Sequence, residues 1–226
     1  MELYLNATSP YARLVRIVLQ EKGLADDVTL KWCDPWADDA DLLKANPAGR
    51  IPALVTEAGT TLSESMLIAV HLDSVSPTPP MLPAASLGYV LHLAGLGQNL
   101  MDAAFTTVIA RKHVGNEIDE SELGQRRSRA IKRLLNQLNG ELGEKQQASS
   151  INLGDIAIAV ALDYLAFRLP EVNWKEEYPR LQEWHAGVTA RASFRRLHSF
   201  SRVFANTMTA SITSLLRGVI VWSNIT

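Results

Sequence analysis

The stretch TSPYARLVRIVLQEKGL, residues 8–24, follows a short apolar run at residues 3–5 and begins with a serine and a proline at its second and third positions. Ser9 is a preferred helix N-cap, because its hydroxyl accepts a hydrogen bond from an otherwise unpaired backbone N–H group, and Pro10 suits the first helical position. Apolar residues then recur at helical spacing until a glycine ends the pattern. The stretch predicts a strand followed by a helix. It leaves open whether Ser9 is only a cap or also part of a reactive site.

The rest of the first 75 residues alternates between strand-like and helix-like segments. The patterns predict strands at residues 28–32, 51–56 and 60–62, and helices at residues 38–45 and 65–74. The last two strands are separated by a turn-like Glu-Ala-Gly sequence and are expected to form a hairpin. A strand–helix–strand start, followed by a hairpin and a helix, predicts a small mixed sheet with helices on its faces.

A proline-rich segment, SPTPPMLP at residues 76–83, interrupts this pattern. Four prolines in eight residues exclude the interior of a helix or a central strand, so we expect an extended linker. Beyond it, apolar residues recur at helical spacing almost throughout. The expected organisation is therefore an α/β domain at residues 1–75, a linker at 76–84, an all-helical domain at 85–200 and an atypical C-terminal extension at 201–226.

The second half contains one strong helix-start signal. Asn152 precedes a long apolar run, and Asp155 stands three residues later, which together predict a variant capping box at the start of a buried helix. The polar run at residues 144–150 predicts a loop before this helix, and residues 177–190 predict a further helix after it.

The composition is that of an ordinary globular protein, with 226 residues, 47% hydrophobic and 20% charged, and a formal net charge of −2. This balance does not indicate a nucleic-acid partner. The single cysteine, Cys33, excludes a disulfide framework within the chain and an all-cysteine metal site, and we expect no metal. The N-terminus does not resemble a secretory signal, and no apolar run up to residue 205 is long enough to span a bilayer. We expect a cytoplasmic protein without a membrane role.

Four segments in register carry a family resemblance: residues 8–24, NPAGRIPALV at 46–55, LSESMLIAVHL at 62–72 and NLGDIAIAVALDYLAFR at 152–168. Together they resemble the cytosolic glutathione S-transferases, bacterial members in particular, over roughly residues 1–198. The resemblance implies a thioredoxin-like N-terminal domain followed by an all-helical C-terminal domain. It also implies a homodimer that conjugates glutathione, as a cosubstrate, to a hydrophobic electrophile, with a role in detoxification.

The resemblance assigns the glutathione site to Arg50, Ile51, Pro52, Glu64 and Ser65. The family has a cis peptide bond before the proline that matches Pro52, which would turn the backbone N–H and C=O groups of Ile51 toward an extended tripeptide. Glu64 and Ser65 open a helix, and the N-terminus of a helix attracts carboxylates. In the family, the matching residues hold the γ-glutamyl end of glutathione. Ser65 would donate to its carboxylate and Glu64 would accept from its ammonium group.

Ser9 stands where the cysteine-using classes of this family have a Cys-Pro-Phe or Cys-Pro-Tyr sequence. The resemblance therefore implies that Ser9 contacts the glutathione sulfur. A hydroxyl donor at a helix N-terminus favours the thiolate, which is the nucleophile, and lowers the thiol pKa. Because serine cannot form a mixed disulfide, the substitution argues against thiol–disulfide exchange at this position. Cys33 lies away from the motif and is expected to be a small buried hydrophobe.

The electrophile is expected to bind between the two domains. The candidates for its pocket are aromatic, Met and Ile side chains of the first helix and of two helices in the second domain: Tyr11, Met101, Phe105, Ile109 and Tyr164. Trp36, Arg111 and His113 are further candidates at the rim of this pocket.

Several alternatives stay open. The apolar tail at residues 201–226 could pack over the site as a terminal helix, form an exposed extension or reflect a change of reading frame. The family resemblance also allows a non-catalytic ligand-binding or regulatory protein of the same fold. A glutathione-dependent peroxidase, lyase or isomerase is a further alternative.

Overall fold

The computed structural model describes residues 1–142 and 150–197. The predicted loop at 144–150 falls almost wholly outside the described residues, and the tail at 201–226 does so completely. The first part of the chain contains seven helices and strands besides a short 3₁₀ turn, close to the predicted ones: β1 (Glu2–Leu5), α1 (Pro10–Glu21), β2 (Thr29–Trp32), α2 (Ala40–Ala45), β3 (Ala53–Val55), β4 (Thr61–Ser63) and α3 (Ser65–Val75).

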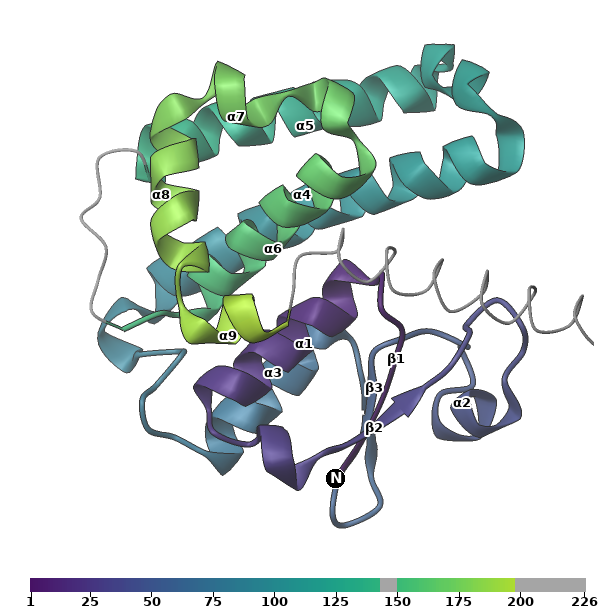
Figure 1. Ribbon diagram of the computed structural model, residues 1–226, viewed down its shortest axis with the longest axis vertical. Helices are drawn as coiled ribbons and strands as arrows, with labels where there is room; N and C mark the ends of the chain where they lie inside the picture. The colour runs from purple at the N-terminus through teal and green to yellow at the C-terminus, as the bar shows by residue number, and fades with distance from the viewer. Residues whose placement is uncertain (143–149, 198–226) are drawn as a thin grey trace, which may run out of the picture.

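The sheet has the strand order β2-β1-β3-β4, with β1 parallel to β2 and the other pairs antiparallel. Successive side chains of a strand point to opposite faces. Leu3 and its partner Leu54 pack into the core with α1 and α3, whereas Tyr4 and its partner Ala53 pack with Leu42 of α2. The sheet is therefore covered on both faces, as Figure 1 shows.

The linker is held by one buried ion pair at the end of α1. Lys22 Nζ lies 2.7 Å from Asp73 Oδ1 and donates to the carbonyl of Pro79 at 2.6 Å. The same aspartate accepts from the backbone N–H groups of Met81 and Leu82. The segment has no helix or strand because prolines remove the donors that either would need, and Asp73 supplies partners for two of the N–H groups that remain.

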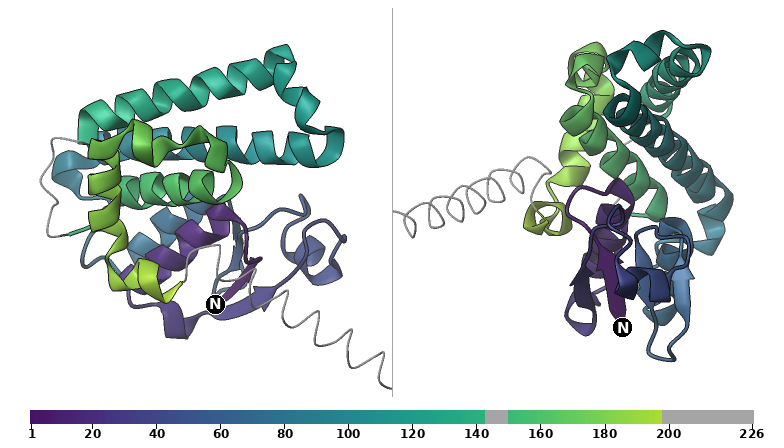
Figure 2. Two further views of the ribbon diagram at one scale, coloured as in Figure 1. Left: turned by 45° about the horizontal axis from the view of Figure 1, so that its top comes forward. Right: turned by 90° about the vertical axis from the view of Figure 1, so that its right-hand side faces the viewer.

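The second part of the described chain is helical. Its long helices form a bundle that lies beside α1 (Figures 1 and 2). In chain order the α-helices, with the 3₁₀ helices between them, are η2 (Ala84–Ser86), α4 (Leu87–Val114), η3 (Asn116–Glu120), α5 (Glu122–Leu142), α6 (Leu153–Arg168), η4 (Pro170–Val172), α7 (Trp174–Glu177), α8 (Pro179–Thr189) and α9 (Ala192–Arg196).

Helix α6 is the centre of this bundle. The predicted capping box is present: Asn152 Oδ1 accepts from Asp155 N, and the Asp155 carboxylate accepts from Asn152 N, each at 3.1 Å. Most side chains from Leu153 to Leu165 are buried. Helix α4 approaches α6 closely at Gly97, where an added Cβ would lie 2.6 Å from the backbone carbon of Ala157.

One predicted helix begins two residues later than expected. Residues 177–190 were expected to form a helix, and the structure has α8 at Pro179–Thr189, with Glu177 as the last residue of the short helix α7. Tyr178 lies between them with φ −130° and ψ 68°. The residue before a proline is sterically disfavoured in the α region, which explains the break.

The architecture is a thioredoxin-like N-terminal domain followed by an all-helical C-terminal domain. None of the helices within residues 1–142 and 150–197 is long and apolar enough to cross a membrane.

Candidate functional site

A small cavity of about 90 Å³ lies where β4 and α3 meet the first turns of α1 and the middle of α4. It brings together six of the sequence-predicted site residues with four that were not predicted. The lining consists of Tyr11, Asn46, Arg50, Ile51, Pro52, Ser63, Glu64, Ser65, Gln98 and Asp102.

One wall of the cavity is the loop before β3. The Ile51–Pro52 peptide bond is cis, as the resemblance implies. Asn46, which is buried, donates from Nδ2 to the carbonyl of Arg50 at 2.8 Å and accepts from Ala48 N. Asn46 thus holds the backbone that leads into Ile51. The Asn-Pro-Ala-Gly sequence is a turn signal that could have indicated this role.

The opposite wall is the start of α3. Ser65 is the first residue of this helix and is 3% exposed. Glu64 precedes it with φ 69°, a left-handed conformation that is uncommon for residues with a side chain and that often occurs at functional sites. Arg50 Nη1 lies 3.5 Å from Glu64 Oε1, and both side chains are more than half exposed. The cavity therefore combines a helix N-terminus with one cation and one carboxylate.

Ser9 acts as the N-cap of α1. Its Oγ accepts from Ala12 N at 3.2 Å, and its own N–H donates to Asn6 Oδ1 at 2.8 Å. The residue is 8% exposed and is not among those that line the cavity. A hydroxyl that accepts one bond still has its own proton to donate. The structure therefore shows the N-cap role of Ser9. Contact between its hydroxyl and a sulfur atom stays a prediction, and the capping hydrogen bond is compatible with it.

Tyr11 connects the two domains across the cavity. Its hydroxyl donates to Asp102 Oδ1 at 2.6 Å, and Gln98 Nε2 donates to the same oxygen at 2.9 Å. Burial raises the pKa of the Tyr11 phenol far above its ordinary value, and the hydrogen bond and charge of Asp102 raise it further. The phenol stays protonated, and its proton is directed to Asp102. Asp102 and Gln98 carry no local sequence signal for this position.

Comparisons with known proteins show similarity to one family in both parts of the chain. The family models for the N-terminal and C-terminal domains of glutathione S-transferases match residues 8–75 and 122–187. The GST-like protein YibF of Escherichia coli (strain K12) is 32% identical over 199 residues, which cover 87% of this chain and 97% of YibF. The chain belongs to the glutathione S-transferase family.

Two further similarities refine the picture. The crystal structure of a glutathione transferase family member from Pseudomonas fluorescens Pf-5, with bound glutathione, superposes with a TM-score of 0.79 and 31% identity. The superposed region covers 87% of this chain and 98% of the Pseudomonas fluorescens chain. The stringent starvation protein A homolog of Pasteurella multocida is 39% identical over 83 residues, only 37% of this chain and 38% of that protein.

The side chains predicted to form the electrophile pocket of this transferase-family chain differ in how exposed they are to solvent. The Tyr11 and Phe105 rings meet edge to face with centroids 5.5 Å apart, and Phe105 and Ile109 are partly exposed. Met101 (0% exposed) and Tyr164 (2% exposed) are buried in the core, and their assignment to the pocket stays a prediction. Met101 shares the buried face of α4 that packs on α6, and α6 is buried on most sides.

The three rim candidates differ in their surroundings. Trp36 lies against the end of α4, with the His113 ring centroid 5.4 Å from its own. Arg111 forms ion pairs with Asp119 and Glu171, which fixes it within the helical domain.

The single cysteine, Cys33, is partly buried, and burial raises the pKa of its thiol, so an inert role is consistent with the structure.

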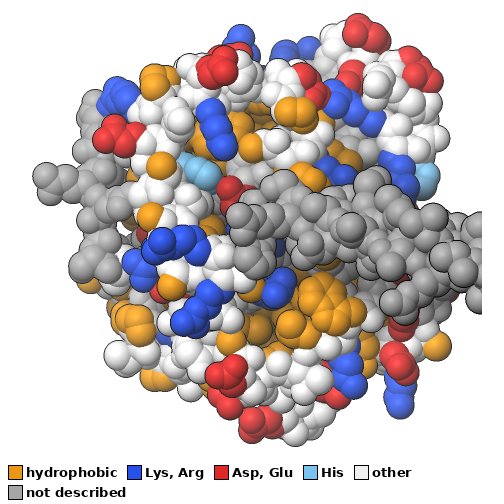
Figure 3. Space-filling model, in the orientation of Figure 1, with side chains coloured by type: hydrophobic (Ala, Val, Ile, Leu, Met, Phe, Trp, Pro, Cys, Tyr) orange, Lys and Arg blue, Asp and Glu red, His pale blue; other side chains and the backbone are white. Residues whose placement is uncertain are grey.

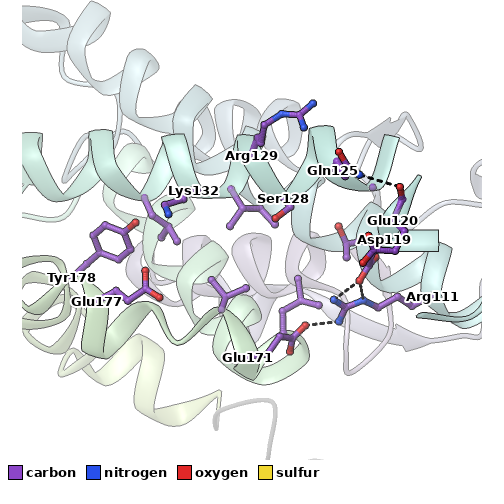
Figure 4. A pocket seen from close by; sticks show the side chains of 16 residues that line it. Arg111, Asp119, Glu120, Gln125, Ser128, Arg129, Lys132, Glu171, Glu177 and Tyr178 are labelled. Atoms are coloured by element: carbon purple, nitrogen blue, oxygen red, sulfur yellow. Dashed lines mark hydrogen bonds and ion pairs between the residues drawn. The ribbon is translucent and has the colours of Figure 1, made fainter. Parts of the chain in front are cut away.

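A larger groove of about 590 Å³ lies within the helical domain, between α4, α5, η4 and α7 (Figure 4). Lys132 and Ser128 of α5 face Glu177 and Tyr178 across it, and the Arg111 ion pairs close one end. None of the residues that line this groove belongs to the four segments that carry the family resemblance.

In the described part of the chain, no group of three or more His, Cys, Asp or Glu side chains is placed to hold a metal ion.

Proposed function

We propose that this protein is a glutathione S-transferase that conjugates glutathione to a hydrophobic electrophile. The observation that carries the proposal is the cavity in which Arg50, Ile51, Pro52, Glu64 and Ser65 meet. The similar structure from Pseudomonas fluorescens contains bound glutathione, which supports glutathione as the ligand.

Within this proposal, glutathione binds as an extended strand beside Ile51. The backbone groups of Ile51 pair with the cysteinyl part of the tripeptide. Ser65 and the N-terminus of α3 bind the γ-glutamyl carboxylate, since a helix N-terminus presents unpaired N–H groups and positive potential. Glu64 accepts from the ammonium group, and Arg50 supplies positive charge at the same end.

Ser9 activates the thiol. Its hydroxyl proton and the N-terminus of α1 both stabilise the thiolate relative to the thiol, which increases the fraction of nucleophile at neutral pH. Tyr11 is a poorer donor to sulfur, because its proton is already directed to Asp102 at 2.6 Å. Catalysis then results from holding the thiolate beside the electrophile.

The protein is proposed to work in the cytoplasm, in detoxification, as a homodimer. Exposed large apolar side chains on α3 and α4 support the dimer, because a partner subunit would remove them from water: Leu67, Val70, Leu87 and Leu91. Sedimentation at micromolar concentration should give twice the chain mass.

A second candidate is a non-catalytic binding or regulatory protein, which is favoured by the similarity of 83 residues to a stringent starvation protein A homolog, a protein that is not named as a transferase. Calorimetric titration separates the two. We expect glutathione to bind, and S-hexylglutathione to bind more tightly because its alkyl chain reaches an apolar surface. No binding of either ligand would contradict the proposed function. Binding without turnover of any electrophile would support the second candidate, or a glutathione-dependent peroxidase or isomerase if those reactions are found.

A further inference from the structure

The large groove within the helical domain is separate from the cavity between the two domains. It lies between α5 on one side and η4 and α7 on the other, and its volume of about 590 Å³ is typical of a small-molecule site. It shares no lining residue with the cavity at Ile51 and Ser65. The groove is therefore a candidate site in its own right.

One end of the groove is formed at the break between α7 and α8. Pro179 disfavours a helical conformation for Tyr178, which lies between the two helices with its ring in the core, 6% exposed. Tyr178 lines the groove, and its hydroxyl forms no hydrogen bond within residues 1–142 and 150–197. Burial and then the charge of Glu177 raise the pKa of the phenol. The hydroxyl therefore keeps a proton that a ligand in the groove can accept.

Two opposite charges face each other at the same end. Lys132 of α5 and Glu177 of α7 lie on opposite walls (Figure 4). Both side chains are exposed, and neither forms an ion pair with another residue that the structure describes. The Arg129 side chain points away from Glu177 and Tyr178, so Lys132 is the cation of α5 that faces this end (Figure 4). The end thus presents one ammonium group, one hydroxyl and one carboxylate.

The rest of the groove differs from this charged end. Its far end is closed by ion pairs within the protein, between Arg111 and the carboxylates of Asp119 and Glu171. Apolar residues line the part between the two ends: Ile131, Leu135, Leu169 and Val172. An apolar group that extends from the charged end would cover this surface.

We propose that the groove binds a free α-amino acid with a large apolar side chain. Its α-carboxylate accepts hydrogen bonds from Lys132 and from the Tyr178 hydroxyl, and its α-ammonium group donates to Glu177. Its side chain lies along the apolar part of the groove. The two walls decide the ligand class: an apolar anion is repelled by Glu177 and an apolar cation by Lys132, whereas a zwitterion pairs with both. This site does not depend on the proposed glutathione chemistry.

The test uses L-phenylalanine and two analogues that each lack one of its charges. The analogue 2-phenylethylamine has no carboxylate, and 3-phenylpropanoate has no ammonium group. Binding to the full-length wild-type protein is measured by calorimetry, with and without saturating glutathione. We expect L-phenylalanine to bind with a Kd between about 10 μM and 1 mM under both conditions. Each analogue should bind at least about tenfold more weakly.

Variants of the charged end assign the site. Lys132→Met and Glu177→Gln should each weaken L-phenylalanine binding by about tenfold or more, because each removes a charge-assisted hydrogen bond. Tyr178→Phe should weaken it by about threefold to tenfold. Glu177→Gln should also bind 3-phenylpropanoate more tightly than the wild type does, since the repelling carboxylate is absent. A merely structural role of Glu177 would not produce this gain.

Matched controls remove an exposed charge of the same sign that does not line the groove. Arg133→Met on α5 and Glu183→Gln on α8 should bind L-phenylalanine like the wild type. Ser65→Ala should do so as well, because Ser65 lines the other cavity.

Three results would each overturn the proposal. The first is no binding of L-phenylalanine at concentrations up to about 10 mM. The second is an affinity for either analogue that equals the affinity for L-phenylalanine. The third is binding that persists unchanged in Lys132→Met and is lost in Ser65→Ala or in saturating glutathione, since the amino acid would then occupy the cavity between the domains.

Discussion

At the residue scale, Ser65 is the side chain with the most specific expected role. It is nearly inaccessible to solvent, yet it lies at the first position of α3 on the wall of the cavity. A buried hydroxyl at this place is consistent with a partner that arrives with the ligand.

Ser65→Ala should weaken glutathione binding by roughly 10- to 100-fold, because a hydrogen bond to a charged group contributes about 1.5–3 kcal/mol. Calorimetry measures the change. Ser74→Ala is the control, since this serine lies at the far end of α3 and donates to the His71 carbonyl. An unchanged dissociation constant in Ser65→Ala would remove Ser65 from the site.

The residue scale also shows where sequence reasoning was limited. Ser65, Glu64 and Pro52 belong to short motifs, so their position in one cavity could be predicted from local sequence and resemblance. Asp102 and Tyr11 are 91 positions apart and meet only because the tertiary arrangement brings the first turn of α1 to the middle of α4. The pocket assignment of Met101 and Tyr164, which are both buried, stays a prediction, because apolar spacing identifies a helix face without indicating whether that face meets the core or a ligand.

At the element scale, the contact between α4 and α6 depends on glycine. Gly97→Ala should lower the free energy of unfolding by about 1–3 kcal/mol, because the new methyl group would overlap the backbone of α6. Chemical denaturation measures this change. Gly95→Ala, on the same helix but with no atom within 4 Å of the added Cβ, should instead stabilise the protein by about 0.5–1 kcal/mol. Equal effects at both positions would contradict the close contact.

Local signals explain most of the element prediction. The Ser9 cap, the Asn152–Asp155 capping box and the proline-rich segment each determine a boundary through contacts within a few residues. The helix predicted at residues 177–190 begins two residues later, at Pro179, and this proline could have indicated the boundary because the residue before a proline is disfavoured in the α region. The tertiary arrangement of α4 and α6 has no comparable local signal.

At the scale of the whole molecule, two carboxylates tie α1 to the helical domain. Asp163 of α6 lies between Arg13 of α1, at 3.1 Å, and His185 of α8, at 3.0 Å. Glu21 of α1 accepts two hydrogen bonds from Arg191, at 2.8 and 2.9 Å. Lys and Arg side chains gather on this side of the molecule, near the end of α8 and α9 (Figure 3).

Both carboxylates should make the domain contact sensitive to acid. Burial raises the pKa of Asp163 and of Glu21, but hydrogen bonds and charges from His185, Arg13 and Arg191 outweigh it, and each pKa lies below its ordinary value. Such a group contributes stability above its unfolded-state pKa, about 3.9 for Asp and 4.3 for Glu. This stability is lost as pH falls through the folded-state value.

The free energy of unfolding should therefore decrease as the pH is lowered from about 5 to 2. Glu21→Gln should be less stable than the wild type at neutral pH and should lose less stability on acidification, because one titrating group is absent. Denaturation at several pH values measures both effects. Parallel curves for the two proteins would contradict the role of Glu21.

The central claim is that the protein binds glutathione and stabilises its thiolate through Ser9. The most direct measurement is an ultraviolet difference titration of the bound glutathione thiolate, with wild-type protein and with Ser9→Ala. The account predicts that wild-type protein lowers the pKa of the bound thiol below the value of free glutathione, and that Ser9→Ala raises it again with little change in affinity. A bound thiol that titrates like free glutathione, or identically in both proteins, would contradict the claim.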